Sequence, residues 1–495
     1  MSAFMVEKSR HSSRGRSKSQ VRKTEDPLLA AWSETLARRG QDAAIFDSEG
    51  RVIFRFGEIE QLSRRYEKVE PGLTNYAAGD IVAIQIGNHP HWPALFLACL
   101  RRGIVALPIE RTVSVAERAA ALRTCRVAGL ITNPEKPIAR IETSGIVDWE
   151  KRQPVLLKLT SGTTATPRAI RFRSEQLLAD AVQICETMGI TEADLNFAVI
   201  PISHSYGFSN LITPLLIRGV AMVVSGDRLP RAVLDDLART GATVFPGMPV
   251  FFQAFGEMPN PPQLPKLRLC ISAGAPLPSA VARRFREKFG LPIHSFYGAS
   301  ECGGICYARE APDEREGFVG TPMEGVKLEP VGGTAGTSAA GDKATQVRVR
   351  SAAVGNGYFP QPEPEKLGAG CFVPDDLLML EKNGVRLVGR ISDVINVAGK
   401  KVNPAEVEAH LLNHEKVRQA VVFGRSSPLR NEEVVACVVA DKPADEAELL
   451  KFCRARLSGW QVPKRIFLLD ALPANERGKI SRRELAQQFA GGVFP

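Results

Sequence analysis

From residue 80 onward, short apolar runs rich in β-branched residues alternate with longer segments of helical pattern. Strands that alternate with helices in this way build βαβ units, in which the strands pair in parallel and the helices cover the sheet. The first part of the chain is therefore expected to be a large α/β domain. The predicted strands lie at 81–85, 104–107, 197–201, 220–224, 243–246 and 267–272, and the first predicted helices at 92–101 and 113–122.

The pattern changes after Arg390. A chain of 495 residues is too long for one hydrophobic core, so a second folding unit is expected. Strand-like runs at 419–423, 434–440 and 465–469 and a helix near 445–457, opened by the capping pair Asp445 and Glu448, describe a compact α+β unit.

We therefore predict three parts: a tail at 1–25, a large N-terminal domain at 26–390 and a small C-terminal domain at 391–495, with a hinge near Ile391. A polar, Gly-rich stretch at 331–346 is typical of a surface hairpin or loop in a β-rich subdomain of the large domain.

The formal net charge of +10 is unevenly distributed. Residues 1–25 hold seven Lys or Arg residues against two Glu residues, and they have few apolar side chains to bury. Disorder is the expected state of this tail, with a nucleic-acid or membrane-surface role as the alternative. Elsewhere the composition is that of an ordinary globular protein, with 44% hydrophobic and 24% charged residues.

Nine scattered cysteines form no CxxC pair, which favours reduced, mostly buried thiols and no metal cluster. No apolar run reaches the roughly eighteen residues that span a bilayer, and no apolar segment of a secretory signal follows the basic start. We expect a cytoplasmic protein.

The most informative motif is the stretch LKLTSGTTATPR at 157–168. Hydroxyl residues, a Gly and a cation after an apolar strand can wrap phosphates with backbone N–H groups, hydroxyls and a positive charge. The motif is not a Walker A loop, since GxxxxGK[ST] occurs nowhere in the chain. A polar surface loop is the alternative. The candidate phosphate-binding residues are Thr160, Ser161, Gly162, Thr163, Thr164 and Arg168.

Three more motifs follow in order: FYGASE at 296–301, GRISDVINVAGKK at 389–401 and RGKIS at 477–481. Together the four motifs resemble those of the adenylate-forming superfamily of acyl-CoA synthetases, luciferases and peptide-synthetase adenylation domains. The resemblance covers nearly the whole chain after the tail. It implies a large AMP-binding domain and a small C-terminal lid domain that moves about the hinge.

The resemblance assigns roles to individual residues. The loop at 160–168 would bind the phosphates, with Thr163 among the catalytic groups, and Glu301 would hold Mg²⁺, because a carboxylate beside a phosphate makes sense only with a metal between them. An ordinary surface acid is the alternative for Glu301. Tyr297 would flank the adenine beside Gly298, and Ser300 would contact the α-phosphate. The adenine-side loop would be Gly274, Ala275 and Pro276.

The ribose would be held by Asp376 and Arg390, since a carboxylate suits two vicinal hydroxyl donors. The Thr-Gly that usually precedes this Asp in the family is absent, so the choice between Asp375 and Asp376 stays open. Lys479 resembles the family's catalytic lysine, whose charge would offset the repulsion between a carboxylate and the α-phosphate. A capping box, Ser481 to Glu484, would fix the loop before it.

The chain departs from the family at three further positions. Ala165 replaces a Gly of the phosphate loop, and Arg168 replaces the usual Lys, although Arg still clamps phosphate in a forked geometry. Ser392 stands where the family hinge often has Asp or Lys. We expect these changes to affect rate and loop order more than the type of reaction.

The stretch PISHSYGF at 201–208 lacks the acid that holds the amine in amino-acid-activating relatives, so an amino acid is disfavoured. His204 resembles the residue that shields the carboxylate end of the pocket, with a structural histidine as the alternative. Apolar residues that fit a fatty or aryl tail, but also a protein core, are Phe208, Phe245, Met248 and Phe251.

The leading hypothesis is an ATP-dependent acid–thiol ligase that uses ATP, Mg²⁺ and coenzyme A to make acyl-CoA from a fatty or aryl acid. Gly399 would let the pantetheine arm pass close to the backbone. One alternative is an acyl-AMP ligase that loads a carrier protein. The other is a non-catalytic nucleotide-binding or nucleic-acid-associated protein, against which Glu301 and Lys479 argue; no stable nucleic-acid or transmembrane contact is expected.

Overall fold

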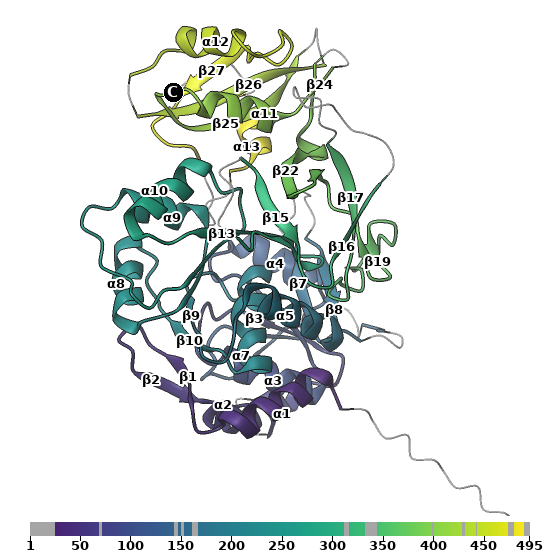
Figure 1. The fold of residues 1–495 in the computed structure, drawn as a ribbon. Helices are drawn as coiled ribbons and strands as arrows, with labels where there is room; N and C mark the ends of the chain where they lie inside the picture. Colours follow the sequence, from purple (N-terminus) through teal and green to yellow (C-terminus); the bar gives the residue numbers. More distant parts are fainter. Residues whose placement is uncertain are drawn as a thin grey trace, which may run out of the picture.

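The computed structural model of the chain divides it into a large N-terminal part and a smaller C-terminal unit, which lies at one end of the molecule (Figure 1). It describes residues 25–68, 72–142, 147–149, 153–160, 167–310, 316–331, 344–397, 400–427, 431–441, 443–473 and 480–489. The predicted α/β class is confirmed, with two sheets in the N-terminal part and one in the C-terminal unit.

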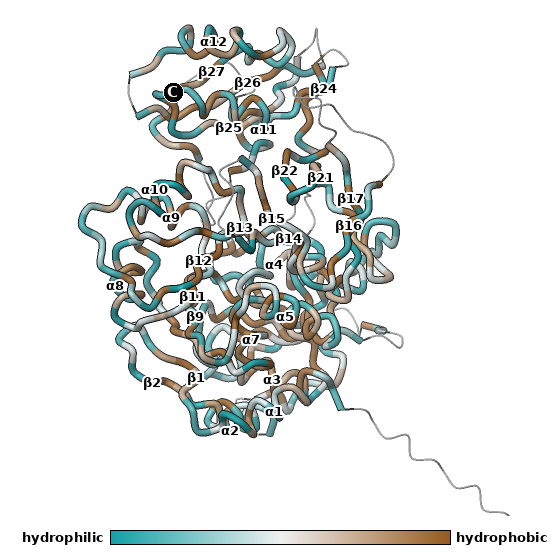
Figure 2. Tube along the Cα trace, viewed as in Figure 1, coloured by the Kyte–Doolittle hydropathy of each residue, from teal (hydrophilic) through white to brown (hydrophobic). Residues whose placement is uncertain are grey.

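The central sheet of the N-terminal part has six parallel strands, in the order β1–β10–β9–β11–β12–β13, with β2 antiparallel at the edge. Hydrophobic residues follow these strands through the middle of the molecule (Figure 2). The bounds are β1 Ala43–Phe46, β2 Val52–Arg55, β9 Leu195–Ala198, β10 Ala221–Val224, β11 Val244–Gly247, β12 Leu269–Ser272 and β13 Ile293–Ala299.

Beyond β13 the same sheet continues with antiparallel strands, in the order β14–β15–β22–β21–β17–β20–β19, and β16 pairs with β17. The antiparallel pairing of β16 with β17 agrees with the hairpin predicted at 331–346. Residues 332–343 themselves lie outside the described chain. The bounds are β14 Gly303–Tyr307, β15 Phe318–Pro322, β16 Lys327–Pro330, β17 Thr345–Arg350, β19 Leu367–Gly368, β20 Cys371–Phe372, β21 Asp376–Glu381 and β22 Gly384–Arg390.

A second sheet has the order β18–β8–β7–β4–β3–β5–β6, with parallel pairs at its centre. Strand β18 reaches this sheet from a distant part of the chain, where Tyr358 pairs with Ile170 of β8. The bounds are β3 Ile81–Ile84, β4 Val105–Pro108, β5 Gly129–Ile131, β6 Ala139–Arg140, β7 Leu156–Leu159, β8 Ala169–Phe172 and β18 Tyr358–Phe359.

Helices pack between and around the two sheets. The rings of Phe96 and Phe208 form a T-shaped pair with 5.0 Å between their centroids. This pair joins a helix beside the second sheet to a π-helical turn, η2, beside the first. The bounds are α1 Pro27–Arg39, α2 Phe56–Lys68, η1 Leu73–Asn75, α3 Trp92–Arg102, α4 Val115–Thr124, α5 Ser174–Met188, α6 Ser205–Gly207, η2 Phe208–Ile212, α7 Thr213–Arg218, α8 Pro230–Thr240, α9 Pro249–Glu257 and α10 Ser279–Phe289.

The helix predicted at 113–122 is displaced by two residues at each end. It begins at Val115 because the Ser114 hydroxyl accepts the Glu117 N–H, and the Glu117 carboxylate accepts the Ser114 N–H. The helix predicted at 92–101 is confirmed, and Gly103 ends it with φ +65°.

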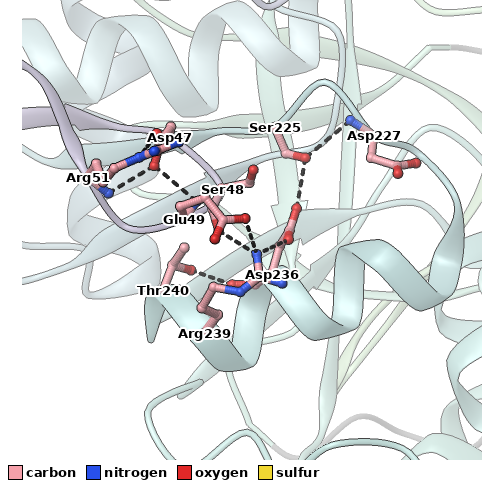
Figure 3. A network of polar contacts seen from close by, with 9 residues as sticks. All are labelled: Asp47, Ser48, Glu49, Arg51, Ser225, Asp227, Asp236, Arg239 and Thr240. Atoms are coloured by element: carbon pink, nitrogen blue, oxygen red, sulfur yellow. Dashed lines mark hydrogen bonds and ion pairs between the residues drawn. The ribbon is translucent and has the colours of Figure 1, made fainter.

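A polar network ties the β1–β2 turn to α8 (Figure 3). Arg239 of α8 donates to the Ser48 carbonyl and pairs with Glu49 and Asp236. Asp236 is buried and also accepts a hydrogen bond from the Ser225 hydroxyl at 3.0 Å. A buried carboxylate is thus held by a serine and a cation.

The C-terminal unit has its own core, built on strands β24–β23–β26–β25 with β27 paired to β26. As predicted, Asp445 caps its second helix by accepting the Glu448 N–H at 2.8 Å. The bounds are η3 Ile391–Asp393, β23 Ile395–Val397, β24 Lys400–Val402, α11 Pro404–Leu412, β25 Val417–Ser427, β26 Asn431–Ala440, α12 Glu446–Arg454, β27 Arg465–Leu468 and α13 Arg482–Gln488.

Arg482 at the start of α13 joins three elements of this unit. It donates to both Glu408 carboxylate oxygens at 2.8 Å, to Asp393 at 2.7 Å and to the Val422 carbonyl at 3.0 Å. Burial raises the pKa of Glu408, and Arg482 opposes that shift. The ion pair with Asp393 ties the last helix to η3, next to the proposed hinge.

We predict that Arg482→Met lowers the opening free energy of α13 and β25 by roughly 2 kcal/mol, because Glu408 keeps a buried charge without its partner. Hydrogen–deuterium exchange of peptides from these elements measures the change. Arg465→Met is the matched control: its ion pair with Glu446 is more exposed, so a change below roughly 1 kcal/mol is expected. Equal losses in the two variants would contradict the account.

Candidate active site

Glu301 lies on the turn of a hairpin at the carboxyl end of the parallel sheet. Strands β13 and β14 pair antiparallel, with Ala299 opposite Gly303, and the Cys302 N–H donates to the Ala299 carbonyl at 3.2 Å. A Cβ at Gly298 would lie 2.6 Å from the Gly303 carbonyl oxygen, so this predicted site residue has to be a glycine. In open α/β sheets, ligands bind at the carboxyl ends of the strands.

The Glu301 carboxylate is held by contacts from a distant segment. The Tyr358 hydroxyl donates to its Oε1 at 3.0 Å, and the Gly355 N–H donates to the Glu301 carbonyl at 2.8 Å. Burial raises the pKa of Glu301, and the Tyr358 hydrogen bond opposes this shift. A carboxylate that is costly to bury as an anion gains from a bound cation, and its hard oxygen donors suit Mg²⁺.

Arg168 contacts the same tyrosine, Tyr358, that donates to Glu301. Its guanidinium lies 3.9 Å from the centre of the Tyr358 ring and pairs with Glu363. The Arg168 carbonyl accepts from the Thr160 N–H at 3.0 Å and the Thr160 hydroxyl at 3.2 Å, so the two ends of the predicted phosphate loop are joined. Predicted residues outside the described chain are Ser161, Gly162, Thr163, Thr164, Gly399 and Lys479.

The structure separates the two candidates for the ribose carboxylate. Asp376 is buried and accepts from the Tyr297 hydroxyl and from Arg390 Nε, both at 2.7 Å. Asp375 is exposed and pairs with Lys366 at 2.8 Å. Three predicted residues, Tyr297, Asp376 and Arg390, therefore form one cluster that excludes Asp375.

His204 lies at the start of the short helix α6. It caps α6, where its Nδ1 accepts the Tyr206 N–H at 3.3 Å. The Tyr206 hydroxyl lies 3.3 Å from the carbonyls of Gly247 and Ile271, at the carboxyl ends of β11 and β12. The predicted loop residues follow β12 and are exposed: Gly274, Ala275 and Pro276.

Phe208 and Phe245 belong to the core rather than to an open pocket. Phe208 is 1% and Phe245 0% exposed, and their rings pack on Phe96 and Phe252. The core alternative left open by the sequence therefore applies to both.

The cysteines are mostly buried, as the sequence predicted. All nine cysteines are unpaired thiols, and only Cys371 is more than slightly exposed. Over the described residues, no cluster of three or more His, Cys, Asp or Glu side chains could hold a metal. Across the same part of the chain, none of the helices has both the length and the apolar character that a membrane crossing requires.

Two family models match this chain. The model for AMP-binding enzymes matches residues 34–148 and 140–359, and the model for the C-terminal domain of AMP-binding enzymes matches residues 406–479. The first match includes the Glu301 turn and Tyr358, and the second lies within the C-terminal unit.

Individual proteins are similar over nearly the whole chain. The oxalate–CoA ligase of Arabidopsis thaliana is 26% identical over 508 residues, which cover 93% of this chain and 98% of that protein. The feruloyl-CoA synthase of Amycolatopsis sp is 27% identical over 494 residues, with 93% and 99% covered. The crystal structure of ATP-bound MatB from Rhodopseudomonas palustris has the same fold, with a TM-score of 0.80, 23% identity, and 93% and 99% covered.

We predict that Asp376→Asn weakens AMP binding at least about tenfold, because a neutral amide no longer offers a charged acceptor to hydroxyl donors or to Arg390. Isothermal titration calorimetry measures the affinity. The neighbouring Asp375→Asn is the matched control and should stay within about twofold of wild type. A larger loss in Asp375→Asn than in Asp376→Asn would show that the cluster does not hold the ribose.

Proposed function

Since the chain belongs to the family of AMP-binding enzymes, we propose that it is an ATP-dependent ligase that joins a carboxylic acid to a thiol through an acyl-adenylate. One observation carries the proposal: Tyr358 contacts both Glu301 and Arg168. These contacts lie where the two ends of the proposed phosphate loop are joined by a hydrogen bond. Similar proteins are named CoA ligases, which supports coenzyme A as the thiol.

In the first half-reaction, a carboxylate oxygen attacks the α-phosphorus of ATP, the P–O bond to the β-phosphate breaks, and pyrophosphate leaves. The loop at 160–168 would bind the phosphates, and Arg168 would add a forked cation. Glu301 would hold Mg²⁺, which when bound offsets negative charge on the phosphates. Lys479 would place a further positive charge on the transition state.

A second group of residues would bind the nucleoside part of ATP. Asp376 and Arg390 would bind the ribose, Tyr297 would line the adenine, and Ser300 would contact the α-phosphate. Burial raises the pKa of Tyr297 well above its ordinary value, so its hydroxyl stays protonated and keeps donating to Asp376. This bond would hold the carboxylate ready for the ribose hydroxyls.

In the second half-reaction, the thiol attacks the acyl carbon and AMP leaves. Strands β23 and β24 pair antiparallel, with Val397 opposite Lys400, and Gly399 falls between these two residues in the sequence. We propose that this hairpin faces the thiol and that residues 391–495 turn about the segment near Ser392 between the two steps. A carrier-protein thiol is the second candidate acceptor, and a cytoplasmic location remains a prediction from the sequence.

The acid is proposed to be a fatty or aryl acid. The stretch at 201–208 has no acidic residue for a substrate amine, and one relative is named for a feruloyl group. Another relative is named for oxalate, so a small dicarboxylic acid belongs on any test panel.

We predict Mg²⁺-dependent exchange of labelled pyrophosphate into ATP with at least one acid from a panel of fatty, aryl and dicarboxylic acids. Adding coenzyme A, or separately a phosphopantetheinylated carrier protein, to the active acid then identifies the thiol by mass spectrometry. Coenzyme A is the expected acceptor. No exchange with any acid of the panel would contradict the proposed first half-reaction.

A second prediction separates the two half-reactions. Lys479→Ala should slow adenylation on the order of a hundred- to a thousandfold but leave thioester formation from supplied acyl-AMP largely intact. Gly399→Leu should do the reverse, because its side chain would fill the space that the thiol arm needs. Single-turnover measurements give the rate of each step in each variant. Equal slowing of both steps in both variants would contradict an alternating C-terminal domain.

A further inference from the structure

A buried lysine lies behind the active site, two residues before Thr160. Lys158 on β7 is 4% exposed, and its Nζ lies 4.6 Å from the centre of the Phe172 ring and 3.3 Å from the Ser209 hydroxyl. A buried ammonium group is costly unless it is paired and hydrogen-bonded. Burial lowers the pKa of Lys158, and the negative charge of Asp180 opposes that shift.

Ser209 connects this lysine to a buried carboxylate. Its hydroxyl accepts from Lys158 and donates to Asp180 Oδ2 at 2.5 Å. Ser209 lies in the π-helical turn η2, a distortion that often marks a functional site, and Asp180 lies on α5. Both side chains are less than 5% exposed. Cation, hydroxyl and carboxylate thus form one continuous chain of hydrogen bonds.

The other oxygen of Asp180 binds the backbone at the start of β14, just after the Glu301 turn. Oδ1 accepts the Gly304 N–H at 3.2 Å, and a Cβ at Gly303 would lie only 1.9 Å from the same oxygen. Gly303 also has φ +69°, a conformation that favours glycine. The carboxylate therefore packs directly against the backbone that follows the Glu301 turn.

We propose that Lys158, Ser209 and Asp180 form a positioning relay, which sets the Glu301 turn against the phosphate loop for binding of Mg²⁺ and ATP. One end of the relay is on β7, which leads into the loop, and the other end holds β14, which leads out of the turn. The relay rests on the proposed function, because it matters only if Glu301 meets a metal-bound nucleotide. Its members are proposed as positioning residues, which act through the backbone of β14 rather than by touching substrate or metal.

The chain contains a matched control for the central hydroxyl. Ser225 is also buried, and it also donates to a buried carboxylate, that of Asp236, which is paired with Arg239 (Figure 3). None of these three residues is among the proposed site residues. Ser209→Ala and Ser225→Ala therefore remove the same chemical group from two similar networks.

The test is calorimetric binding of α,β-methylene-ATP, which resists cleavage at the α-phosphorus, over a series of Mg²⁺ concentrations. Ser209→Ala should raise the Mg²⁺ concentration for half-maximal binding about tenfold, as is typical when a partner behind a metal ligand is lost. Ser225→Ala should stay within about twofold of wild type. Thermal unfolding of both variants measures the purely structural loss, which should be similar.

A second variant removes both charges. Lys158→Met/Asp180→Leu replaces the charged pair by apolar side chains, a kind of change that is often tolerated, but leaves the Gly304 N–H without its acceptor. It should fold and show at least the same rise in Mg²⁺ requirement. Wild-type Mg²⁺ dependence in Ser209→Ala or in the double variant, or an equal rise in Ser225→Ala, would overturn the relay alone. Failure of the wild-type protein to bind the analogue at any Mg²⁺ concentration would overturn the proposed function itself.

Discussion

The contact of Tyr358 with Glu301 and Arg168 is the interaction on which the site depends. Tyr358 pairs with the second sheet, whereas Glu301 lies on the turn that ends the parallel strands of the first. One aromatic side chain therefore links the two sheets at the point where a carboxylate and a guanidinium lie beside the joined ends of the proposed phosphate loop. The Arg168 guanidinium lies over the face of the Tyr358 ring, and the Tyr358 hydroxyl donates to the Glu301 carboxylate. The two opposite charges therefore lie on either side of one residue and do not pair directly.

The local features of this architecture could be predicted from the sequence, since they depend on neighbouring residues. Strands showed as short apolar runs, and a capping pair such as Asp445 and Glu448 marked a helix start. The start predicted at Val113 was wrong by two residues: the helix begins at Val115, because the Ser114 cap outweighs the apolar pattern. The order of the four motifs along the chain, rather than any single motif, indicated the family.

Contacts between distant residues could not be predicted in the same way. Tyr358 and Ser209 carry no local signal, because their contacts are with partners on other elements. Likewise, only the contacts with Tyr297 and Arg390 favour Asp376 over Asp375 as the candidate. The relay behind Glu301 is of the same kind. Its three residues come from three elements and form one hydrogen-bonded chain only when the two sheets are packed together. The position of the Glu301 turn therefore depends on the packing of the sheets.

The central claim is that this arrangement directs a carboxylate to the α-phosphorus of ATP. The most direct measurement uses an acid labelled with ¹⁸O in both carboxylate oxygens, followed by mass spectrometry of the products after transfer to the thiol. Attack at the α-phosphorus places one ¹⁸O atom in AMP and none in pyrophosphate. Label in inorganic phosphate, or unlabelled AMP formed together with the thioester, would contradict the account.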